Sequence, residues 1–239
     1  MTKSNGYLHK RVRTRGRTFV SLLILVLAVL AFSACKADST VEIKLQSSSK
    51  GTLEFKLNVD EEAASFLRDD AFTKQTFDDV FQTKELKEAG FKVEVKENTD
   101  GKDSSIIVKK SFGSQAQLKS ALKVFADEKV VDATLDATTT FTNENTKLNL
   151  SIDLSKLKEQ YLDDSLKEKV TSAGYNWDQY KALVEKGFES TTLKVTVMGD
   201  KKTEKTLSTS DEKTTFAAEK NSFRSGFVFS IIAGIACLG

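Results

Sequence analysis

The segment 52–59, TLEFKLNV, decides the class of fold, because its four apolar residues occupy every second position. In an extended strand these four side chains would point to one side and the polar ones between them to the other. The segment 41–45, VEIKL, alternates in the same way, and the serine-rich stretch 47–51 separates the two. Alternating segments joined by a short turn predict an antiparallel hairpin with one buried face.

Three further pairs of alternating segments each predict two neighbouring strands: 91–95 with 106–108, 131–141 with 148–152, and 193–197 with 207–216. The first of these pairs flanks Asn98-Thr99-Asp100-Gly101, and Asp-Gly between such segments is a strong signal for a hairpin turn. The second pair flanks Asn143-Glu144-Asn145, where another turn is expected. The segment 207–216 is the weakest of the predicted strands.

Helical periodicity occurs between the hairpins, in the segments 60–67, 77–90, 118–125, 157–170 and 177–184. Gly90 ends the second segment at a position suited to the left-handed residue that follows a helix, and Gly187 closes the last one. Ser114 and Gln117 have the spacing of a capping box at the start of the third segment.

Together these segments predict an α+β fold, in which antiparallel β-hairpins form a curved sheet or a small barrel with flanking helices. The predicted domain covers residues 41–218. Its halves are alike: residues 55–60 match 148–153 at an offset of 93, and residues 84–91 match 181–188 at an offset of 97. Duplication explains these matches, and so does chance similarity between two alternating sequences.

The composition excludes several kinds of active site. The chain has one histidine, His9, and two cysteines, Cys35 and Cys237, all outside the predicted domain. Ser-His-Asp or Cys-His catalysis, zinc sites with nitrogen or sulfur ligands, and a disulfide within the domain therefore have no residues to form them. We expect no enzyme, no cofactor and no metal site.

The N-terminus has the organisation of an export signal. Six basic residues and no acidic ones precede the apolar run 19–32, whose 14 residues suit a secretory signal and are few for a membrane-spanning helix. Phe32-Ser33-Ala34-Cys35 then resembles a bacterial lipobox, in which the cysteine is acylated and becomes the mature N-terminus. Phe32 departs from that pattern, which prefers an aliphatic residue there.

We therefore expect a lipoprotein signal peptide at 1–34, lipidation of Cys35 with a palmitate-type acyl group, and a short tether at 35–40. The alternative is an ordinary secretory signal that leaves Cys35 unmodified. Both place the protein outside the cytoplasm, and the first places it on the extracytoplasmic face of the cell membrane. Of 36 Lys+Arg and 34 Asp+Glu, 30 and 34 remain once the leader is removed, so the net charge of −4 gives no reason to expect nucleic-acid binding.

The C-terminal segment 223–239 is predominantly apolar. As a helix its 17 residues would extend about 25 Å, just under the thickness of a bilayer core. We expect a transmembrane helix here, with a truncated reading frame or a tail buried against the domain as the alternatives. An acyl anchor and a spanning helix both enter the membrane at its outer face, so both ends of the domain would be held near that surface.

The order of these features resembles the LppM-type domain of actinobacterial membrane lipoproteins. After the lipobox, the resemblance lies in TLEFKLNV (52–59), FDDVF (77–81), IVKKSF (107–112), KLNLSIDL (147–154) and LKVTVMG (193–199). The family usually has Pro-Gly at the last turn and a Trp in the strand after it, where this chain has Met198-Gly199 and Phe216. The resemblance implies an envelope-anchored α+β domain with a pocket for a lipid or glycolipid, and it implies no catalytic residues.

Other candidate sites are weaker. Paired acids occur at Asp69-Asp70, Asp78-Asp79 and Asp163-Asp164, but neighbouring residues on a helix point about 100° apart, so solvated helix faces explain them better than a hydrolytic pair. Lys201, Lys202 and Lys205 could contact anionic headgroups, although a solvated hairpin is the simpler explanation. Two groups of aromatic residues suit core packing or the mouth of an acyl-chain or sugar pocket: Phe66, Phe72, Phe77 and Phe81, and Tyr161, Tyr175, Trp177 and Tyr180.

Three functions follow from these features. The first is a non-enzymatic, membrane-anchored lipoprotein that binds an envelope lipid or glycolipid. The second is a structural or interaction protein of the cell envelope with a protein partner. The third, a hydrolase that uses carboxylates alone, has the least support. A sizeable apolar cavity that opens near the membrane favours the first function, and a filled core with an exposed apolar patch favours the second.

Overall fold

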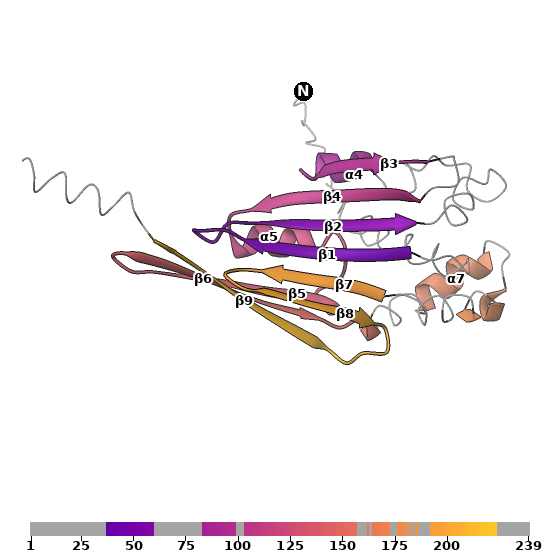
Figure 1. Cartoon of the computed structure of the whole chain (residues 1–239). Helices are drawn as coiled ribbons and strands as arrows, with labels where there is room; N and C mark the ends of the chain where they lie inside the picture. The colour runs from indigo at the N-terminus through magenta and orange to yellow at the C-terminus, as the bar shows by residue number, and fades with distance from the viewer. Residues whose placement is uncertain are drawn as a thin grey trace, which may run out of the picture.

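A computed structural model of the chain describes residues 37–59, 83–98, 103–156, 162, 164–172, 176–179, 181–182, 185 and 192–223. Within them the chain forms nine strands and three helices (Figure 1). In chain order these are β1 (Ala37–Leu45), β2 (Gly51–Val59), α4 (Thr83–Glu88), β3 (Lys92–Lys96), β4 (Ser104–Phe112), α5 (Gln115–Leu122), β5 (Val131–Thr139), β6 (Asn143–Ile152), α7 (Asp164–Ser172), β7 (Thr192–Met198), β8 (Lys202–Ser208) and β9 (Thr214–Phe223).

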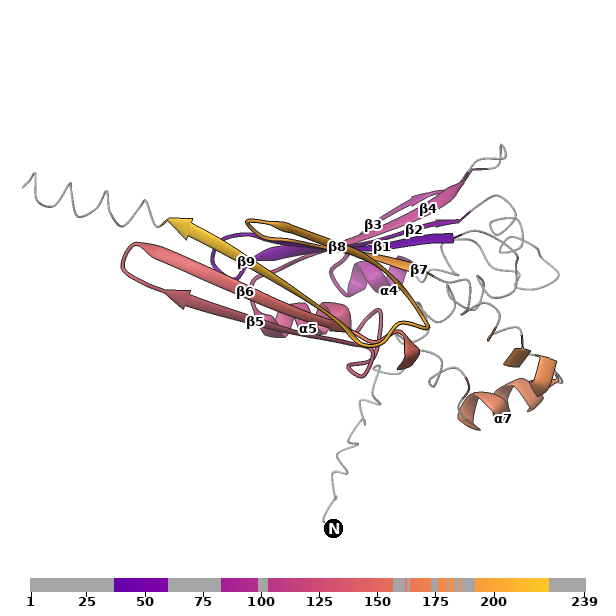
Figure 2. The same ribbon diagram turned by 60° about the horizontal axis from the view of Figure 1, so that its bottom comes forward.

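The strands form two sheets that lie one against the other (Figure 2). One sheet has six strands in the order β3-β4-β2-β1-β7-β8, and the other has three in the order β5-β6-β9. Every pairing is antiparallel except that of β1 with β7, which is parallel. The α+β class is therefore confirmed, while the small barrel is not, because the described strands form two separate sheets with open edges.

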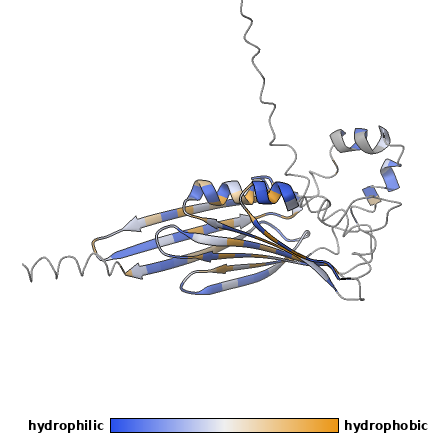
Figure 3. Cartoon of the chain, turned by 90° about the horizontal axis from the view of Figure 1, so that it is seen from above, coloured by the Kyte–Doolittle hydropathy of each residue, from blue (hydrophilic) through white to orange (hydrophobic). Residues whose placement is uncertain are grey.

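The predicted hairpins at 41–59, 91–108 and 131–152 are confirmed as β1–β2, β3–β4 and β5–β6. Their alternation has the expected cause: inward residues of β2 and β6 are almost fully buried, and their neighbours are partly or fully exposed. Hydrophobic and hydrophilic residues accordingly alternate along the strands (Figure 3). The β1–β2 turn places Ser48 and Ser49 at φ 64° and 58°, as a tight hairpin turn requires.

Two local helix signals are also confirmed. The backbone N–H of Gln117 donates to the Ser114 hydroxyl at 3.3 Å, which caps the start of α5. Gly90 follows α4 with φ 82°. The N–H of Gly90 donates to the carbonyl of Lys87, and that of Phe91 donates to the carbonyl of Leu86, each at 3.0 Å, which is the Schellman arrangement for ending a helix.

One turn prediction and one strand prediction are wrong. Asn143 and Asn145 belong to β6, and the turn lies before them, where the Thr140 hydroxyl donates to the carbonyl of Asn143 at 3.0 Å. The predicted strand 207–216 is two strands: Leu207 lies in β8 of the larger sheet and Phe216 in β9 of the smaller one. A turn between them carries the chain from one sheet to the other.

The two halves of the chain share elements but not their pairing. In the sequence match β2 corresponds to β6, and each is an inner strand of its sheet with one buried face. The β3–β4 hairpin, which follows β2, uses β4 to pair with β2 itself. The β7–β8 hairpin, which follows β6, instead uses β7 to pair with β1 in the other sheet. The second half is thus divided between both sheets and does not repeat the topology of the first.

Candidate functional site: an apolar cavity between the sheets

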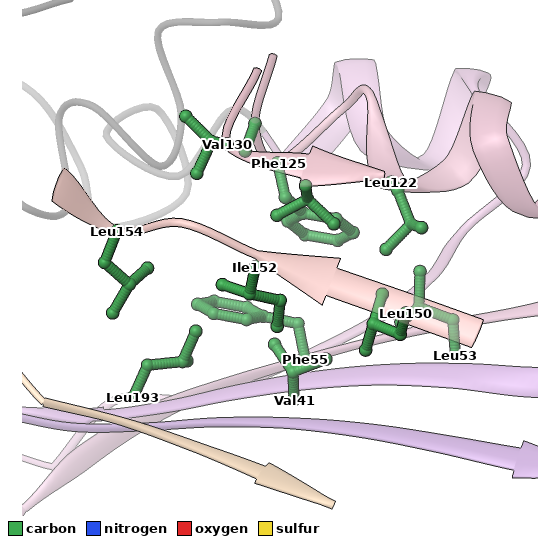
Figure 4. Close-up of a pocket in the computed structure, with 12 residues that line it drawn as sticks. Val41, Leu53, Phe55, Leu122, Phe125, Val130, Leu150, Ile152, Leu154 and Leu193 are labelled. Carbon is green, nitrogen blue, oxygen red and sulfur yellow. The ribbon is translucent and has the colours of Figure 1, made fainter. Parts of the chain in front are cut away.

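A cavity of about 40 Å³ lies between the two sheets (Figure 4). The larger sheet contributes Val41, Leu53, Phe55 and Leu193, the smaller sheet contributes Val131, Leu150 and Ile152, helix α5 contributes Leu122, and the connecting segments contribute Phe125, Ala126, Val130 and Leu154. All twelve side chains are hydrocarbon. The cavity therefore offers no side-chain hydrogen bond or charge to a ligand.

The period of the strands explains why these residues meet. Val41 lies opposite Phe55 in the β1–β2 register, and Leu193 lies beside Ser39 at the start of β7, so all three belong to one face of the larger sheet. On the smaller sheet, Leu150 and Ile152 occupy alternate positions of β6 and face the first group. Each sheet thus presents its apolar face to the other across the cavity.

The segment after α5 closes this apolar space on one side. Phe125 lies in it with its ring centroid 5.2 Å from that of Phe55 and 5.6 Å from that of Phe91, the latter in an edge-to-face contact. The ammonium of Lys110 lies 4.6 Å from the Phe91 ring and donates to the carbonyl of Ala89 at 2.7 Å. The cavity is therefore bounded by a packed aromatic group whose outer edge is fixed by a lysine.

The size of the cavity limits what it holds without rearrangement. Its volume of about 40 Å³ is a fraction of the roughly 150 Å³ of an engineered cavity that binds benzene. An acyl chain would enter only if lining side chains rotated or the sheets moved apart. Because a dry apolar cavity favours apolar occupants, the arrangement suits a hydrocarbon chain and does not suit a polar substrate.

No ionised side chain is among the residues that line the cavity. Hydrogen bonds from Lys194 and Lys202 lower the pKa of Glu204 to about 2. A hydrogen bond from Lys119 lowers the pKa of Asp132. These carboxylates are ion-paired and charged at neutral pH. Among the described residues there is also no group of histidine, cysteine or acidic side chains arranged to hold a metal ion.

Polar contacts join the two sheets at the end of the molecule where the β1–β2, β5–β6 and β7–β8 turns lie, which we call the turn end (residues 46–50, 141–146, 199–201 and 219–223). The Ser48 hydroxyl donates to Glu144 at 2.7 Å, and the N–H of Asp200 donates to the carbonyl of Glu219 at 2.7 Å. The Asp200 carboxylate accepts from Lys220 at 2.8 Å, and this bond lowers the pKa of Asp200.

Two large apolar side chains are exposed at the turn end. Phe141, in the β5–β6 loop, is 62% exposed, and Phe223, the last residue of β9, is 61% exposed. Phe223 lies opposite Asn143 in the β6–β9 register, two residues from Phe141. They form a small apolar feature far from the cavity.

Several residues proposed from the sequence lie outside the described residues. They are Cys35, the tail from Arg224 onward, the acid pairs Asp69-Asp70 and Asp78-Asp79, the aromatic group Phe66, Phe72, Phe77 and Phe81, and Tyr161, Asp163, Tyr175 and Tyr180. Trp177 is half-buried, and Asp164 begins α7 and is exposed. Lys202 and Lys205 lie in β8 and are exposed. The Lys202 ammonium pairs with Glu204 at 2.6 Å, and that of Lys205 donates to the Thr214 hydroxyl at 3.3 Å.

The cavity residues were not named as a site from the sequence. The available signal was the period-two pattern, which places Phe55, Leu150 and Ile152 on inward faces without showing where packing is incomplete. Among the described residues, no helix is long and apolar enough to cross a membrane. No protein family, characterised protein or solved structure shows significant similarity to this chain.

Proposed function

We propose that this protein is a non-enzymatic, membrane-anchored lipoprotein on the extracytoplasmic face of the cell membrane, which binds an acyl chain of an envelope lipid or glycolipid. The observation that supports the ligand is the hydrocarbon cavity between the sheets, whose twelve lining side chains include no polar group. The observation that supports the location is the sequence of residues 1–34, in which a basic segment and an apolar run precede Cys35 as they do in an export signal.

The anchors follow from the chain on each side of the folded domain. Strand β1 begins at Ala37, so only Lys36 separates it from the cysteine proposed to be acylated. At the other end β9 runs to Phe223, and the apolar segment proposed to be a transmembrane helix follows directly. One acyl chain gives only reversible membrane binding, so the second anchor would be what makes attachment stable.

Binding is proposed to enlarge the cavity. Interiors pack densely, and a gap bounded only by aliphatic and aromatic side chains is a place where rotation of those side chains breaks no hydrogen bond. A chain entering between Leu193 and Ile152 would replace weak contacts on both sheets with contacts to itself. The polar headgroup would remain outside, because the lining offers it no partner.

Mass spectrometry of lipids that co-purify with the full-length protein tests the ligand. Val41→Ile combined with Val130→Ile fills part of the cavity and should reduce bound lipid, whereas Leu193→Ala enlarges it and should retain or increase bound lipid. Ile107→Val is the matched control, because Ile107 is half-buried on the outer face of β4. Equal lipid content in all four proteins would contradict the proposal.

Metabolic labelling with palmitate tests the anchor. Cys35→Ala should abolish incorporation of the label and block removal of the leader at this site, because acylation requires the thiol. Cys237→Ala is the control, since it removes the other cysteine of the chain. Unchanged incorporation in Cys35→Ala would show that the lipoprotein assignment is wrong.

A second candidate, an interaction protein of the envelope, is supported by the exposed Phe141 and Phe223 at the turn end. Replacing both with serine should abolish cross-links to a protein partner and leave the co-purifying lipid unchanged. If the double variant loses cross-links while the cavity variants bind lipid as the wild type does, the second candidate replaces the first.

A further inference from the structure

The two ends of the described domain lie at opposite ends of its long axis. Strand β7 runs parallel to β1, with Leu193 beside Ser39, and β8 returns antiparallel to it, with Ser208 beside Thr192. β9 starts six residues after Ser208 and runs in the same direction as β1 (Figure 1, Figure 2). β9 therefore starts near the end at which β1 starts, and it finishes at the other.

The contacts of the turn end confirm this direction. The Asp200 carboxylate, in the β7–β8 turn, accepts hydrogen bonds from Lys220 and from the N–H of Asn221, close to the end of β9. Ser49, in the β1–β2 turn, donates its N–H to the hydroxyl of Thr146 in β6, the strand paired with β9. From Ala37 to Phe223 the separation along the strands is about 30 Å, at about 3.3 Å per residue over the length of β9.

This separation constrains a doubly anchored domain. An upright domain would place one chain end about 30 Å from the bilayer, whereas Ala37 is only two residues from Cys35, a reach of roughly 7 Å. Phe223 likewise adjoins the apolar tail. Both ends reach one bilayer surface only if the strands run along it.

The two outer faces differ in charge. Among the described strands, the outer face of the larger sheet has seven lysines and five acids: Lys44, Lys56, Lys92, Lys96, Lys109, Lys194 and Lys202, with Asp38, Glu42, Glu54, Glu94 and Glu204. The outer face of the smaller sheet has one lysine and three acids: Lys147, with Asp132, Asp136 and Glu219. An anionic membrane surface attracts the first face and repels the second.

We propose that the domain lies lengthwise on the bilayer, with the outer face of its six-stranded sheet against anionic lipid headgroups. This inference rests on the two anchors of the proposed function and adds the orientation that they impose. Lys56 and Lys92 lie in the middle of that face and toward its β3 edge, so the contact would extend across the sheet and not only along β1. The three-stranded sheet would face away from the membrane.

Fluorescence quenching at single labelled cysteines tests the orientation. The full-length, lipidated protein with Cys237→Ser is reconstituted into vesicles of phosphatidylcholine, phosphatidylglycerol and a lipid with a nitroxide headgroup. Thr52→Cys and Asn58→Cys place labels on the proposed contact face, about 20 Å apart along β2. Ala217→Cys and Thr138→Cys place matched labels on exposed positions of the opposite face.

We expect strong quenching at both Thr52 and Asn58 and little at Ala217 and Thr138. Lys56→Glu with Lys92→Glu should reduce quenching at both contact positions, and Lys147→Glu, on the other face, should not. Quenching at Thr52 alone would mean that the domain stands upright on the bilayer. Quenching at Ala217 and Thr138 would mean that the three-stranded sheet faces the membrane. No quenching on vesicle-bound protein would mean that the domain is held away from the bilayer surface. Quenching at the opposite face would overturn the orientation and leave both anchors intact, whereas an upright domain or one held away from the bilayer would also mean that at least one end is not anchored. Failure of the protein to co-float with the vesicles would overturn the anchoring itself, and the orientation with it.

Discussion

The two sheets meet in two different ways along their length. At the turn end they are joined by hydrogen bonds and an ion pair, including those of Asp200 with Lys220 and Asn221. At the cavity itself all the lining side chains are hydrocarbon, and their packing leaves about 40 Å³ unfilled. A polar contact between the sheets outside the turn end is the bond from Lys205 of β8 to Thr214 of β9, at 3.3 Å. Directional bonds fix the relative position of two sheets, whereas apolar contacts allow alternatives of similar energy.

This difference suggests a division of roles. The turn end would hold the sheets in register, so the apolar region could change its packing without loss of the fold. A ligand site between sheets requires both properties, because it must open and yet return to one closed arrangement. The following substitutions test each region separately, beginning with the one expected to have the greatest effect.

Charges placed in the apolar region should unfold the domain. Leu57 is 1% exposed and Leu150 is fully buried, so an aspartate at either position would bury an unpaired charge. That costs several kcal/mol, against the roughly 5–15 kcal/mol that stabilises a typical domain. Lys56→Asp and Asn149→Asp, which lie on the outer faces of the same strands, should be mild. Similar thermal melts for the two pairs would show that the strand register is wrong.

A methyl group at Gly199 should separate the sheets at the turn end. A Cβ there would collide with the backbone of Glu219 in β9, which cannot rotate away as a side chain can. We expect Gly199→Ala to lower the free energy of unfolding by about 1–3 kcal/mol in chemical denaturation. Gly113→Ala is the control, since its Cβ would meet only Gln117 Oε1 at 3.5 Å. Equal effects would mean that the turn end does not determine how the sheets pack.

Relief of backbone strain should strengthen the same end. Ser49 has a left-handed backbone with φ 58°, and its N–H, not its side chain, contacts Thr146 at 3.2 Å. Ser49→Gly keeps that bond and removes the steric penalty, so the free energy of unfolding should rise by up to about 1 kcal/mol. Ser49→Ala keeps the penalty and serves as the control. A glycine variant no more stable than the alanine variant would contradict this account of the turn.

The smallest effect is expected at Glu204, on the surface and away from the region between the sheets. Its pKa falls from 4.5 to about 2 because Lys194 and Lys202 donate hydrogen bonds to it. A lowered pKa in the folded state means that this stabilisation is present above pH 4.5 and is lost as the pH falls toward 2. The difference in melting temperature between wild type and Glu204→Gln should therefore shrink over that range. A difference that stays constant would show that the carboxylate is not paired.

Local features of this fold could be predicted from the sequence, and long-range pairing could not. Alternation identified three hairpins, and the spacing of Ser114 and Gln117 identified a helix cap. Gly90 was placed correctly because a helix often ends with a left-handed residue, and at φ 82° glycine is strongly favoured. Alternation shows that one face of a strand is buried, but it does not show which other element covers that face. The β1–β7 pairing joins residues more than 150 positions apart and has no local signature.

The errors have specific physical causes. Asn143 and Asn145 are turn-forming residues by propensity, but in the structure the Asn145 amide donates to Asn221 across the β6–β9 pair at 2.6 Å, which stabilises the strand instead. β8 was predicted poorly because it is an edge strand with a single buried residue, Leu207. The cavity could not be predicted, because it depends on how completely side chains from six elements and their connections fill one volume.

Intermolecular nuclear Overhauser effects between a lipid acyl chain and the methyl groups of the protein would show whether the chain occupies the cavity. With methyl-labelled protein in detergent micelles and an added envelope lipid, we expect contacts from the chain methylenes to Leu122, Leu150 and Leu193. These residues line the cavity from three different parts of the chain. Contacts confined to the surface around Phe141 and Phe223, with none to the cavity methyl groups, would contradict the proposal.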